Sequence, residues 1–264
     1  MNKIGFIGTG RMGGALAAAA AQNPDNMLLL ANRHPEKAQA LADRIGGTVT
    51  DNLTAASESE LLLLCVKPQM LAELAEELRE PLRQRKTPFT LVSIIAGAEI
   101  SRIQEMLGGD YPVIRVMPNI PVAVGDGVIQ YICSSNVTSD TVDTFLNAFA
   151  AAGRFSPLEE RLANAAACVS GCGPAFAAMF IEALADGGVA CGIPRAKAQE
   201  YAAQMALGTA QYLLKTGVHP GELKDAVCSP GGTTIQGVRA LEESGFRGAV
   251  MDAVIAAYEK TQDL

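Results

Sequence analysis

The sequence predicts an α/β protein in two parts: an N-terminal doubly wound sheet and a smaller C-terminal domain made only of helices. Up to about residue 157, short apolar strand-like runs alternate with helix-length segments, which is typical of repeated β-α-β units. Beyond that point β-branched residues become sparse, and 22 of the 104 residues from Arg161 to Leu264 are alanine. A length of 264 residues suits two modest domains. We therefore predict domains at residues 1–157 and 158–264.

Seven segments of the first domain are predicted to be strands. They are Ile4–Gly8, Met27–Ala31, Gly47–Val49, Leu61–Val66, Thr90–Ile95, Val113–Val116 and Val128–Ile132. The first, second, fourth and fifth are nearly continuous apolar runs, as expected for parallel strands covered on both faces. The helices predicted between them are Met12–Gln22, Pro35–Ile45, Gln69–Gln84 and Glu99–Leu107.

Glycine and proline divide the second domain into six predicted helices. They are Leu158–Val169, Pro174–Ala190, Pro194–Leu214, Pro220–Val227, Thr233–Glu243 and Gly245–Lys260. Three begin with proline, which suits the first turn of a helix. Alanine-rich helices bury little apolar area, so we expect this domain to complete its core against a second copy. The expected assembly is a homodimer, with a higher oligomer of dimers left open and an independent small bundle as the alternative.

Composition excludes several classes of partner. The chain has 21 basic and 28 acidic residues, a net charge of −7, and no basic stretch, so we expect no nucleic-acid binding. Apolar runs such as Ala15–Ala21 and Leu61–Val66 are shorter than the roughly 18–20 residues that span a bilayer, so we expect no membrane association. The first residues lack the pattern of a signal peptide. The expected location is the cytoplasm.

The cysteines and histidines do not suggest a metal site. None of the six cysteines forms a CxxC pair, and the chain has two histidines, His34 and His219. We expect free thiols, as in a reducing compartment, and no metal. The cysteines are Cys65, Cys133, Cys168, Cys172, Cys191 and Cys228.

A glycine motif at residues 8–13 predicts a dinucleotide site. The sequence Gly8-Thr9-Gly10-Arg11-Met12-Gly13 matches G-x-G-x-x-G, follows a predicted strand and opens a predicted helix. In such motifs the first glycine allows a tight turn, the second lets a pyrophosphate approach, and the third permits close helix–strand packing. The context indicates a Rossmann domain, against the alternative of a glycine-rich turn without a ligand. The expected cofactor contacts here are Ile7, Gly8, Thr9, Gly10, Arg11 and Met12.

The end of the second predicted strand favours NADPH as the cofactor, with NADH as the alternative. NAD-specific sites usually carry Asp or Glu there, whereas this chain has Asn32, Arg33 and His34. No carboxylate would repel a 2′-phosphate, and Arg33 could pair with it. We therefore predict cofactor contacts from Asn32 and Arg33, the alternative being that Arg33 is a solvated surface residue.

Two further predicted strand ends lead to the same crevice, because ligands bind beyond the carboxyl ends of parallel strands. One runs into Cys65-Val66-Lys67-Pro68, where Pro68 opens a helix, and the other into Ala96-Gly97, whose small side chains leave room for a flat ring. We expect these residues to contact the cofactor, although Lys67 could also be an ordinary surface lysine.

The C-terminal domain contains a turn suited to an anion. In Ser229-Pro230-Gly231-Gly232-Thr233-Thr234 a helix has ended and another begins. Two glycines and a helix start expose consecutive backbone N–H groups, which together can hold a carboxylate, with two hydroxyls beside it. The alternative is a plain capped junction between helices.

The segment Leu223–Leu241 resembles the signature of the pyrroline-5-carboxylate reductase family. Further segments similar to that family follow in the same order along nearly the whole chain. They are Gly5–Met12, Cys65–Pro68, Ile95–Gly97, Arg115–Asn119 and Ser170–Phe176.

The resemblance implies the last step of proline synthesis, in which the C=N bond of 1-pyrroline-5-carboxylate, a cyclic imino acid, is reduced to L-proline with NADPH or NADH. It implies that Gly232, Thr233 and the following N–H groups hold the substrate carboxylate, within the backbone turn that begins at Gly231, and that Thr234 is the catalytic residue, bonded to the ring nitrogen. Ser229 would shape the turn, Ala96, Gly97 and Asn119 would border the nicotinamide, and Asn52 would contact the adenosine.

Two other functions fit parts of the pattern. A β-hydroxyacid dehydrogenase shares the layout but needs a catalytic lysine in the first long C-terminal helix, and Pro174–Ala190 contains none. A regulatory protein that senses NADPH without chemistry would not need the Pro-Gly-Gly-Thr-Thr turn. Imine reduction needs no strong protein acid, because its proton can come from water, which agrees with the lack of an obvious His or carboxylate catalyst.

Overall fold

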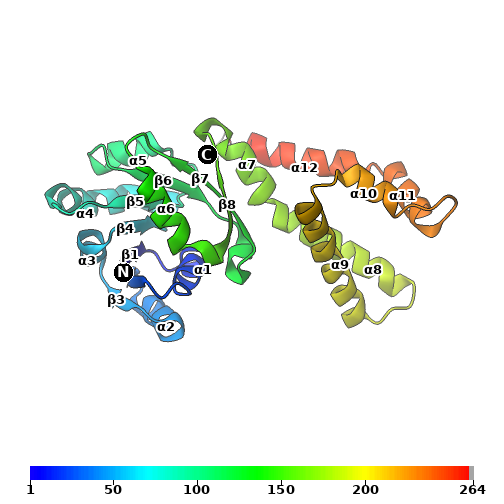
Figure 1. Cartoon of the computed structure of the whole chain (residues 1–264), viewed down its shortest axis with the longest axis horizontal. Helices are drawn as coiled ribbons and strands as arrows, with labels where there is room; N and C mark the ends of the chain where they lie inside the picture. The colour runs from blue at the N-terminus through cyan, green and yellow to red at the C-terminus, as the bar shows by residue number, and fades with distance from the viewer. Residues whose placement is uncertain (262–264) are drawn as a thin grey trace. The chain divides into compact units, whose positions relative to one another are not determined.

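One eight-stranded sheet organises the first part of the chain (Figure 1). The computed structural model describes residues 1–261, in two units: Met1–Gly171, and a helical unit from Cys172 onward. The strands are β1 (Asn2–Ile7), β2 (Asn26–Ala31), β3 (Thr48–Thr50), β4 (Leu61–Leu64), β5 (Thr90–Ser93), β6 (Val113–Met117), β7 (Gly127–Cys133) and β8 (Gly153–Pro157). Their order is β3-β2-β1-β4-β5-β6-β7-β8. The order reverses between β1 and β4, where α/β sheets form their binding crevice.

Helices cover both faces of this sheet. They are α1 (Arg11–Ala20), α2 (Pro35–Ile45), α3 (Asn52–Glu58), α4 (Leu71–Gln84), α5 (Ile100–Leu107), α6 (Ser139–Ala148) and α7 (Ala163–Ser170). Strand β4 shows how the two faces arise, because all four of its leucines are buried. Leu61 and Leu63 join the core formed with α1, α2 and α6, whereas Leu62 and Leu64 join the core formed with α3, α4 and α5. The predicted doubly wound sheet is therefore confirmed.

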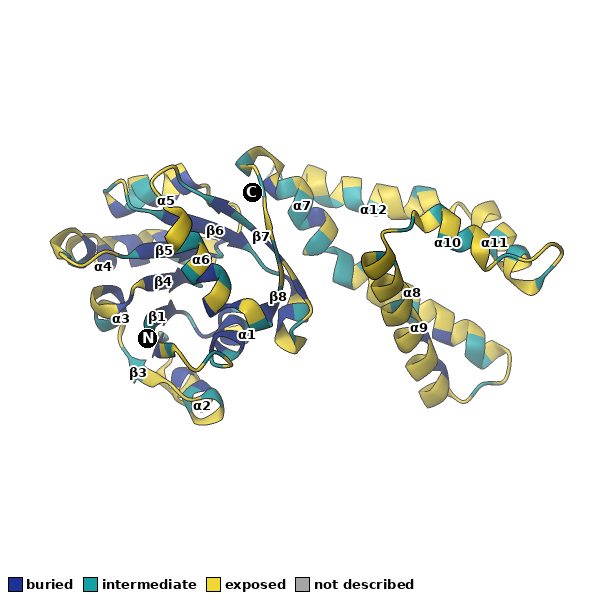
Figure 2. Cartoon of the chain, in the orientation of Figure 1, coloured by how far each residue is buried: buried dark blue, intermediate teal, exposed yellow. Residues whose placement is uncertain are grey.

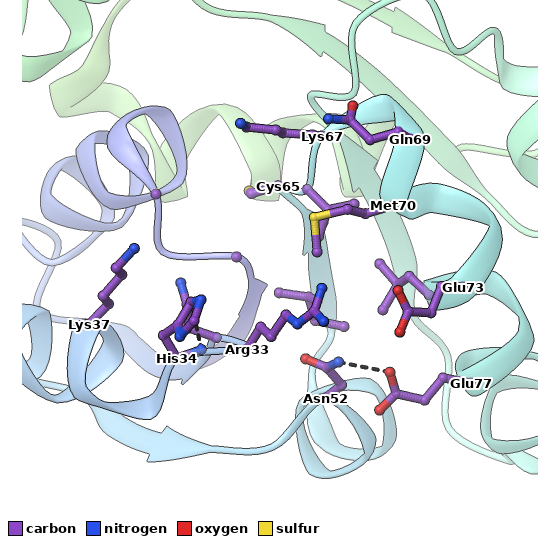
Figure 3. A pocket seen from close by; sticks show the side chains of 16 residues that line it. Arg33, His34, Lys37, Asn52, Cys65, Lys67, Gln69, Met70, Glu73 and Glu77 are labelled. Carbon is purple, nitrogen blue, oxygen red and sulfur yellow. Dashed lines mark hydrogen bonds between the residues drawn. The ribbon is translucent and has the colours of Figure 1, made fainter.

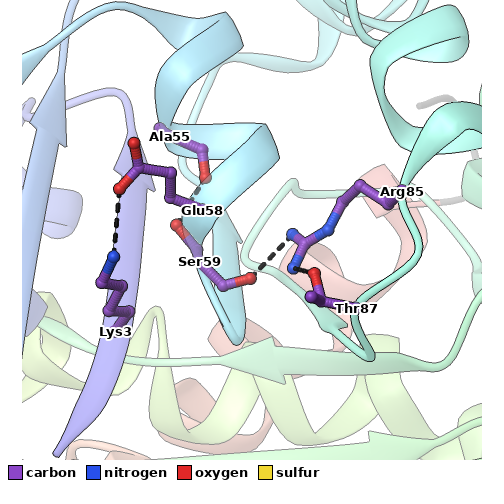
Figure 4. Close-up of polar contacts among 6 residues, drawn as sticks. All are labelled: Lys3, Ala55, Glu58, Ser59, Arg85 and Thr87. Atoms are coloured by element: carbon purple, nitrogen blue, oxygen red, sulfur yellow. Dashed lines mark hydrogen bonds and ion pairs between the residues drawn. The ribbon is translucent and has the colours of Figure 1, made fainter.

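The amino edge of the sheet is closed by polar contacts far from the predicted site (Figure 4). The buried Ser59 hydroxyl donates to the Ala55 carbonyl at 2.5 Å, and the Arg85 guanidinium donates to the Ser59 carbonyl at 2.7 Å. An alanine Cβ at Gly5 would lie 2.1 Å from the Ser59 oxygen. β1 therefore needs a glycine at position 5, and Ser59 has a packing role at this edge.

Two α-helices and one strand of the first unit were not predicted from the sequence: α3, α6 and β8. β7 also differs in direction from a wholly parallel sheet, since it pairs antiparallel with β6 and parallel with β8. The chain reverses through the short turn at Ile120–Val124, which leaves no room for a crossover helix between β6 and β7.

The second unit consists of helices, as predicted. They are α8 (Gly173–Ala190), α9 (Arg195–Thr216), α10 (Pro220–Ala226), α11 (Thr233–Glu243) and α12 (Phe246–Thr261). Within the described chain its buried core is a cluster of three alanines, Ala185, Ala198 and Ala202. Figure 2 shows most of its helical surface as exposed. Large apolar side chains lie on that surface, among them Met179, Leu184, Tyr201, Met205 and Leu214.

The domain boundary predicted after residue 157 coincides with the end of β8, whereas the two units divide after Gly171. Helix α7 is therefore part of the first unit. The last three residues of the predicted domain 158–264 lie outside the described residues.

In the described chain, one helical stretch, Glu160–Ala190, is long and apolar enough to cross a membrane by length and composition alone. Its mean hydropathy is 1.5, and 6% of the apolar window is buried. The expectation from uninterrupted apolar runs missed this stretch, because its many alanines and larger apolar residues keep the mean hydropathy high although glycine and polar residues interrupt the runs. A turn at Gly171–Cys172 separates α7 from α8 within it.

Candidate functional site

The glycine motif forms a tight loop between β1 and α1. Gly8 has φ +103°, a left-handed conformation that favours glycine, and its N–H donates to the Ala31 carbonyl at 2.9 Å. Gly10 is the N-cap of α1 and has no side chain to bond the first turn, which also contains no acidic residue. The first N–H groups of α1 therefore remain available to an anion.

The third glycine of the motif is required by packing. A Cβ at Gly13 would lie 2.2 Å from the Gly8 carbonyl oxygen and 2.9 Å from the Cys65 Cβ. A Cβ at Gly10 would instead meet no atom within 4 Å. The loop thus leaves open space at Gly10, where a pyrophosphate would approach, and none at Gly13, as the motif predicts.

A cavity of about 550 Å³ lies beside this loop at the carboxyl ends of β1, β2 and β4 (Figure 3). Nine residues predicted to contact the cofactor line it: Ile7, Gly8, Gly10, Asn32, Arg33, Asn52, Cys65, Val66 and Lys67. Other predicted contacts are not among its lining residues: Thr9, Arg11, Met12, Pro68, Ala96, Gly97 and Asn119. All sixteen assignments remain predictions, and the cavity shows which of the sixteen residues lie together.

One wall of the cavity is basic. Arg33 and His34 follow β2, and Lys37 lies in the first turn of α2, so three nitrogen-bearing side chains reach the same cavity (Figure 3). Asn32 connects this wall to the glycine loop, because its side-chain amide donates to the Thr9 hydroxyl at 2.7 Å. Asn32 therefore holds the loop and the wall together.

The opposite wall is acidic. Glu73 and Glu77 come from α4, and Glu77 accepts a hydrogen bond of 2.9 Å from the Asn52 side chain (Figure 3). Asn52 opens α3, whose N-cap Asp51 accepts from the Thr54 N–H at 2.7 Å. That hydrogen bond lowers the pKa of the Asp51 carboxyl. The cap fixes the start of α3, where Asn52 lies, and the bond to Glu77 orients the Asn52 side chain.

Asn119 uses its side chain within the first unit. It is buried, its oxygen accepts from the Val128 N–H at 2.9 Å, and its amide nitrogen donates to the Ser170 carbonyl at 3.0 Å. Since the side-chain amide is already bonded at both ends, the predicted contact of Asn119 with a nicotinamide would involve its backbone.

The thiol at the cavity is unsuited to nucleophilic chemistry. Burial raises the pKa of the Cys65 thiol well above its ordinary value, so the group stays protonated near neutral pH. None of the six cysteines is in a disulfide. Across residues 1–261, no cluster of three or more His, Cys, Asp or Glu side chains is arranged to hold a metal ion.

In the second unit, the turn Ser229–Gly232 presents backbone donors. The Gly232 N–H donates to the Ser229 carbonyl at 3.0 Å, and Gly231 has φ +68°. Gly232 is the N-cap of α11 and makes no side-chain capping bond, so the N–H groups of the first turn of α11 are free to bind an anion. Thr233 and Thr234 are exposed beside them.

Gly232 also fits closely against Ser229. A Cβ on Gly232 would lie 2.3 Å from the Ser229 hydroxyl oxygen. Ser229 therefore shapes this turn, as expected, and the turn brings together the residues predicted to bind substrate: Ser229, Gly231, Gly232, Thr233 and Thr234.

Several residues that line the first-unit cavity were not identified from the sequence: His34, Lys37, Gln69, Met70, Glu73, Leu74 and Glu77. Lys37 carried a signal, because it follows Arg33 by four residues at the start of a helix that begins with Pro35. Glu73 and Glu77 are likewise spaced by four residues on one helix, but that pattern is also typical of a solvated face.

Two family models match this chain. One, described as pyrroline-5-carboxylate reductase dimerisation, matches residues 160–264, and one, described as NADP oxidoreductase coenzyme F420-dependent, matches residues 3–97. They cover the helical unit and the glycine-loop half of the sheet, respectively.

Full-length relatives carry the same name. The chain is 38% identical over 266 residues to the pyrroline-5-carboxylate reductase of Escherichia coli, covering 99% of this chain and 98% of the relative. Among solved structures, it resembles Plasmodium falciparum pyrroline carboxylate reductase with NADP bound, at 30% identity and a TM-score of 0.87, covering 99% and 97% of the two chains.

The similarity also holds for a bacterial structure, the pyrroline-5-carboxylate reductase of Coxiella burnetii. Its TM-score is 0.90 at 28% identity, with 99% of this chain and 98% of that chain covered. The glycine loop, the basic cavity wall and the Pro-Gly-Gly-Thr-Thr turn all lie in the regions compared. The chain therefore belongs to the pyrroline-5-carboxylate reductase family.

Proposed function

We propose that this protein reduces 1-pyrroline-5-carboxylate to L-proline with NADPH, the final step of proline synthesis. The observation that carries the proposal is that one chain, similar over its full length to pyrroline-5-carboxylate reductases, combines a glycine loop of the dinucleotide type with a glycine turn that leaves the first N–H groups of α11 uncapped. The bound cofactor supplies the hydride. The residues of this chain bind and orient the two reactants.

The cofactor fits the first-unit cavity. The N–H groups that open α1 would bind the pyrophosphate, and the open space at Gly10 would admit it. The basic wall would bind the 2′-phosphate, and Asn52, held by Glu77, would bind the adenosine. Thr9, Arg11 and Met12 complete the phosphate loop, and Pro68, Ala96, Gly97 and Asn119 extend the site towards the nicotinamide.

Arg33 is the residue on which the preference for NADPH depends. Arg33→Ala should raise KM for NADPH about 10-fold or more and leave KM for NADH nearly unchanged, because only NADPH carries the phosphate to which the guanidinium is bonded. Lys37→Ala should act in the same direction with a smaller effect. Steady-state kinetics with both cofactors measure this.

Arg44→Ala, in the last turn of the same helix α2, is the matched control and should change neither KM. An equal rise of KM for both cofactors in Arg33→Ala would contradict the role in 2′-phosphate recognition.

The substrate carboxylate is bound by the turn from Gly231 to Thr233, with Ser229 setting its shape. Backbone N–H groups serve this purpose without a cationic side chain. Thr234, in the first turn of α11, hydrogen-bonds the ring nitrogen, which becomes an amine as the hydride arrives. What these residues contribute to catalysis is that they bind and orient the substrate.

The overall reaction is tested by following NADPH oxidation. The protein should turn over with 1-pyrroline-5-carboxylate and not with substrates of the 3-hydroxyisobutyrate type, which the dehydrogenase alternative would use. Binding of NADPH with no turnover on any imine would instead support a sensor.

The protein acts as a homodimer formed through the helical unit. The three-alanine core and the exposed apolar side chains of that unit leave it short of buried area, and a second copy supplies the missing contacts. The stretch Glu160–Ala190 then packs against protein and not lipid. Dimers can associate further. Cysteines outside any disulfide suit a cytoplasmic enzyme.

Leu184 tests the dimer. It lines an apolar groove between α8 and α9 and is 43% exposed. Leu184→Glu should weaken dimerisation at least 100-fold, because the partner would bury an unpaired carboxylate. Sedimentation of the full chain over a dilution series measures this.

Leu53→Glu is the matched control, because Leu53 is 44% exposed and lies on α3 of the first unit. The Leu53→Glu protein should remain dimeric. A Leu184→Glu protein that dissociates no more than Leu53→Glu would refute the assignment of the interface.

A further inference from the structure

Helix α7 is fixed to the sheet at its beginning by an ion pair. The buried Arg115 on β6 lies 3.0 Å from the Glu160 carboxylate, and the same carboxylate oxygen accepts from the Ile100 N–H at 3.0 Å. Glu160 begins the short 3-10 turn Glu160–Leu162 that leads into α7, so β6 and α5 together hold the segment from which this helix starts.

The end of α7 is fixed by a second, separate set of bonds. Gln130 on β7 donates from its amide nitrogen to the Ser170 hydroxyl at 2.9 Å, and that hydroxyl donates to the Ala166 carbonyl at 3.0 Å. Asn119 donates to the Ser170 carbonyl at 3.0 Å. Asn119 and Gln130 are only 6% and 7% exposed. Buried amides of this kind are held in one geometry.

These bonds lie at the ligand-binding edge of the sheet. Asn119 comes two residues after β6 ends, and Gln130 is paired in register with Met117, the last residue of β6. β6 runs parallel to β5, and β5 to β4, whose carboxyl end leads into the cavity lining at Cys65–Lys67. The chain leaves the first unit at Gly171, directly after the fixed Ser170.

We propose that Gln130, Ser170 and Asn119 are positioning residues for the reduction. They hold the end of α7 at the nicotinamide edge of the cofactor site and so limit the movement of the reacting groups. The inference rests on the proposed function, because it concerns hydride transfer. A displacement of about 1 Å can cost a reaction of this kind about 100-fold.

The test uses Gln130→Met, Ser170→Ala and the double variant in the full chain. Ser59→Ala is the matched control, because it also removes a buried hydroxyl that bonds a helix carbonyl, but at the opposite edge of the sheet. The measurements are kcat, the Kd for NADPH without substrate, the melting temperature, and the isotope effect on kcat with NADPH deuterated at the transferred position.

We expect kcat to fall about 10- to 100-fold in the single variants, with Kd for NADPH within 2-fold of wild type and a melting temperature like that of Ser59→Ala. The isotope effect should rise, because hydride transfer becomes slower than product release. The double variant should lose no more than the worse single one, since both remove the same bond. Ser170→Thr keeps the hydroxyl and should retain most of the activity. If Ser170→Ala fails to fold, the comparison of Ser170→Thr with Gln130→Met tests the same hydrogen bond.

A kcat within 2-fold of the Ser59→Ala value would overturn the proposal, and so would a loss of kcat matched by an equal rise in Kd. If the wild-type protein does not reduce 1-pyrroline-5-carboxylate, the proposed function fails instead. In that case, backbone amide hydrogen exchange over residues 163–171 tests whether Gln130 and Ser170 hold the end of α7 in place. Faster exchange in Gln130→Met than in Ser59→Ala supports it, and equal exchange refutes it.

Discussion

Gly13→Ala should abolish cofactor binding and destabilise the first unit by about 3 kcal/mol or more, a magnitude typical of severe overpacking. The added Cβ would lie 2.2 Å from the Gly8 carbonyl oxygen, a backbone atom that can move only if the phosphate loop moves. The second clash, with Cys65, ties the loop to the end of β4. Melting curves and NADPH titration measure both effects.

Two neighbouring glycines separate packing from binding. Gly14→Ala would meet atoms only at 3.7–3.9 Å, so it should fold and bind normally and gain the helix propensity of alanine. Gly10→Ala meets nothing within 4 Å, so it should melt normally but bind NADPH more weakly, because its methyl occupies the approach to the pyrophosphate. A Gly13→Ala protein with the stability and affinity of Gly14→Ala would contradict the close packing of the loop.

Thr234→Ala should lower kcat/KM about 10- to 150-fold, the loss expected when one hydrogen bond of 1–3 kcal/mol to the reacting nitrogen is removed. Affinity for NADPH should stay near normal, because the cofactor is bound by the other unit. Thr234→Ser should recover most of the activity, and Thr234→Val should not.

The alternative is that Thr234 only caps the helix. Gly232 is the N-cap of α11, and no side-chain capping bond is made there, so we expect the melting temperature of Thr234→Val to change little. Nearly normal kcat/KM with a lower melting temperature would show that the threonine only stabilises the helix.

Prolines and glycines mark the ends of many helices and strands, and this made much of the fold predictable. The bounds expected for α2 and α11, Pro35–Ile45 and Thr233–Glu243, are those observed. α3 was missed because Asn52–Glu58 is short and mostly polar or small, and β8 because Gly153–Pro157 contains a proline and an arginine. The antiparallel direction of β7 depends on the turn before it, so the hydrophobic periodicity of the strand itself does not predict that direction.

The geometry of the candidate site was predictable where it depends on backbone. Glycine motifs indicated the loop before α1 and the turn before α11, because a side chain at Gly13 or Gly232 would clash with neighbouring atoms. The acidic wall was not predictable, since Glu73 and Glu77 reach the cavity only through the packing of α4. The buried bonds of Asn119 were hidden for the same reason: their partners, Val128 and Ser170, are 9 and 51 residues away.

The alanine core of the second unit has a consequence for how fast the protein is degraded in a cell. If assembly completes that core, a chain without a partner is also a chain with a poorly folded C-terminal half. Dilution, slow synthesis or loss of one copy would then expose cleavable polypeptide, and proteases would remove it while sparing assembled enzyme. Small side chains at Ala185, Ala198 and Ala202 thereby couple the abundance of the enzyme to its assembly.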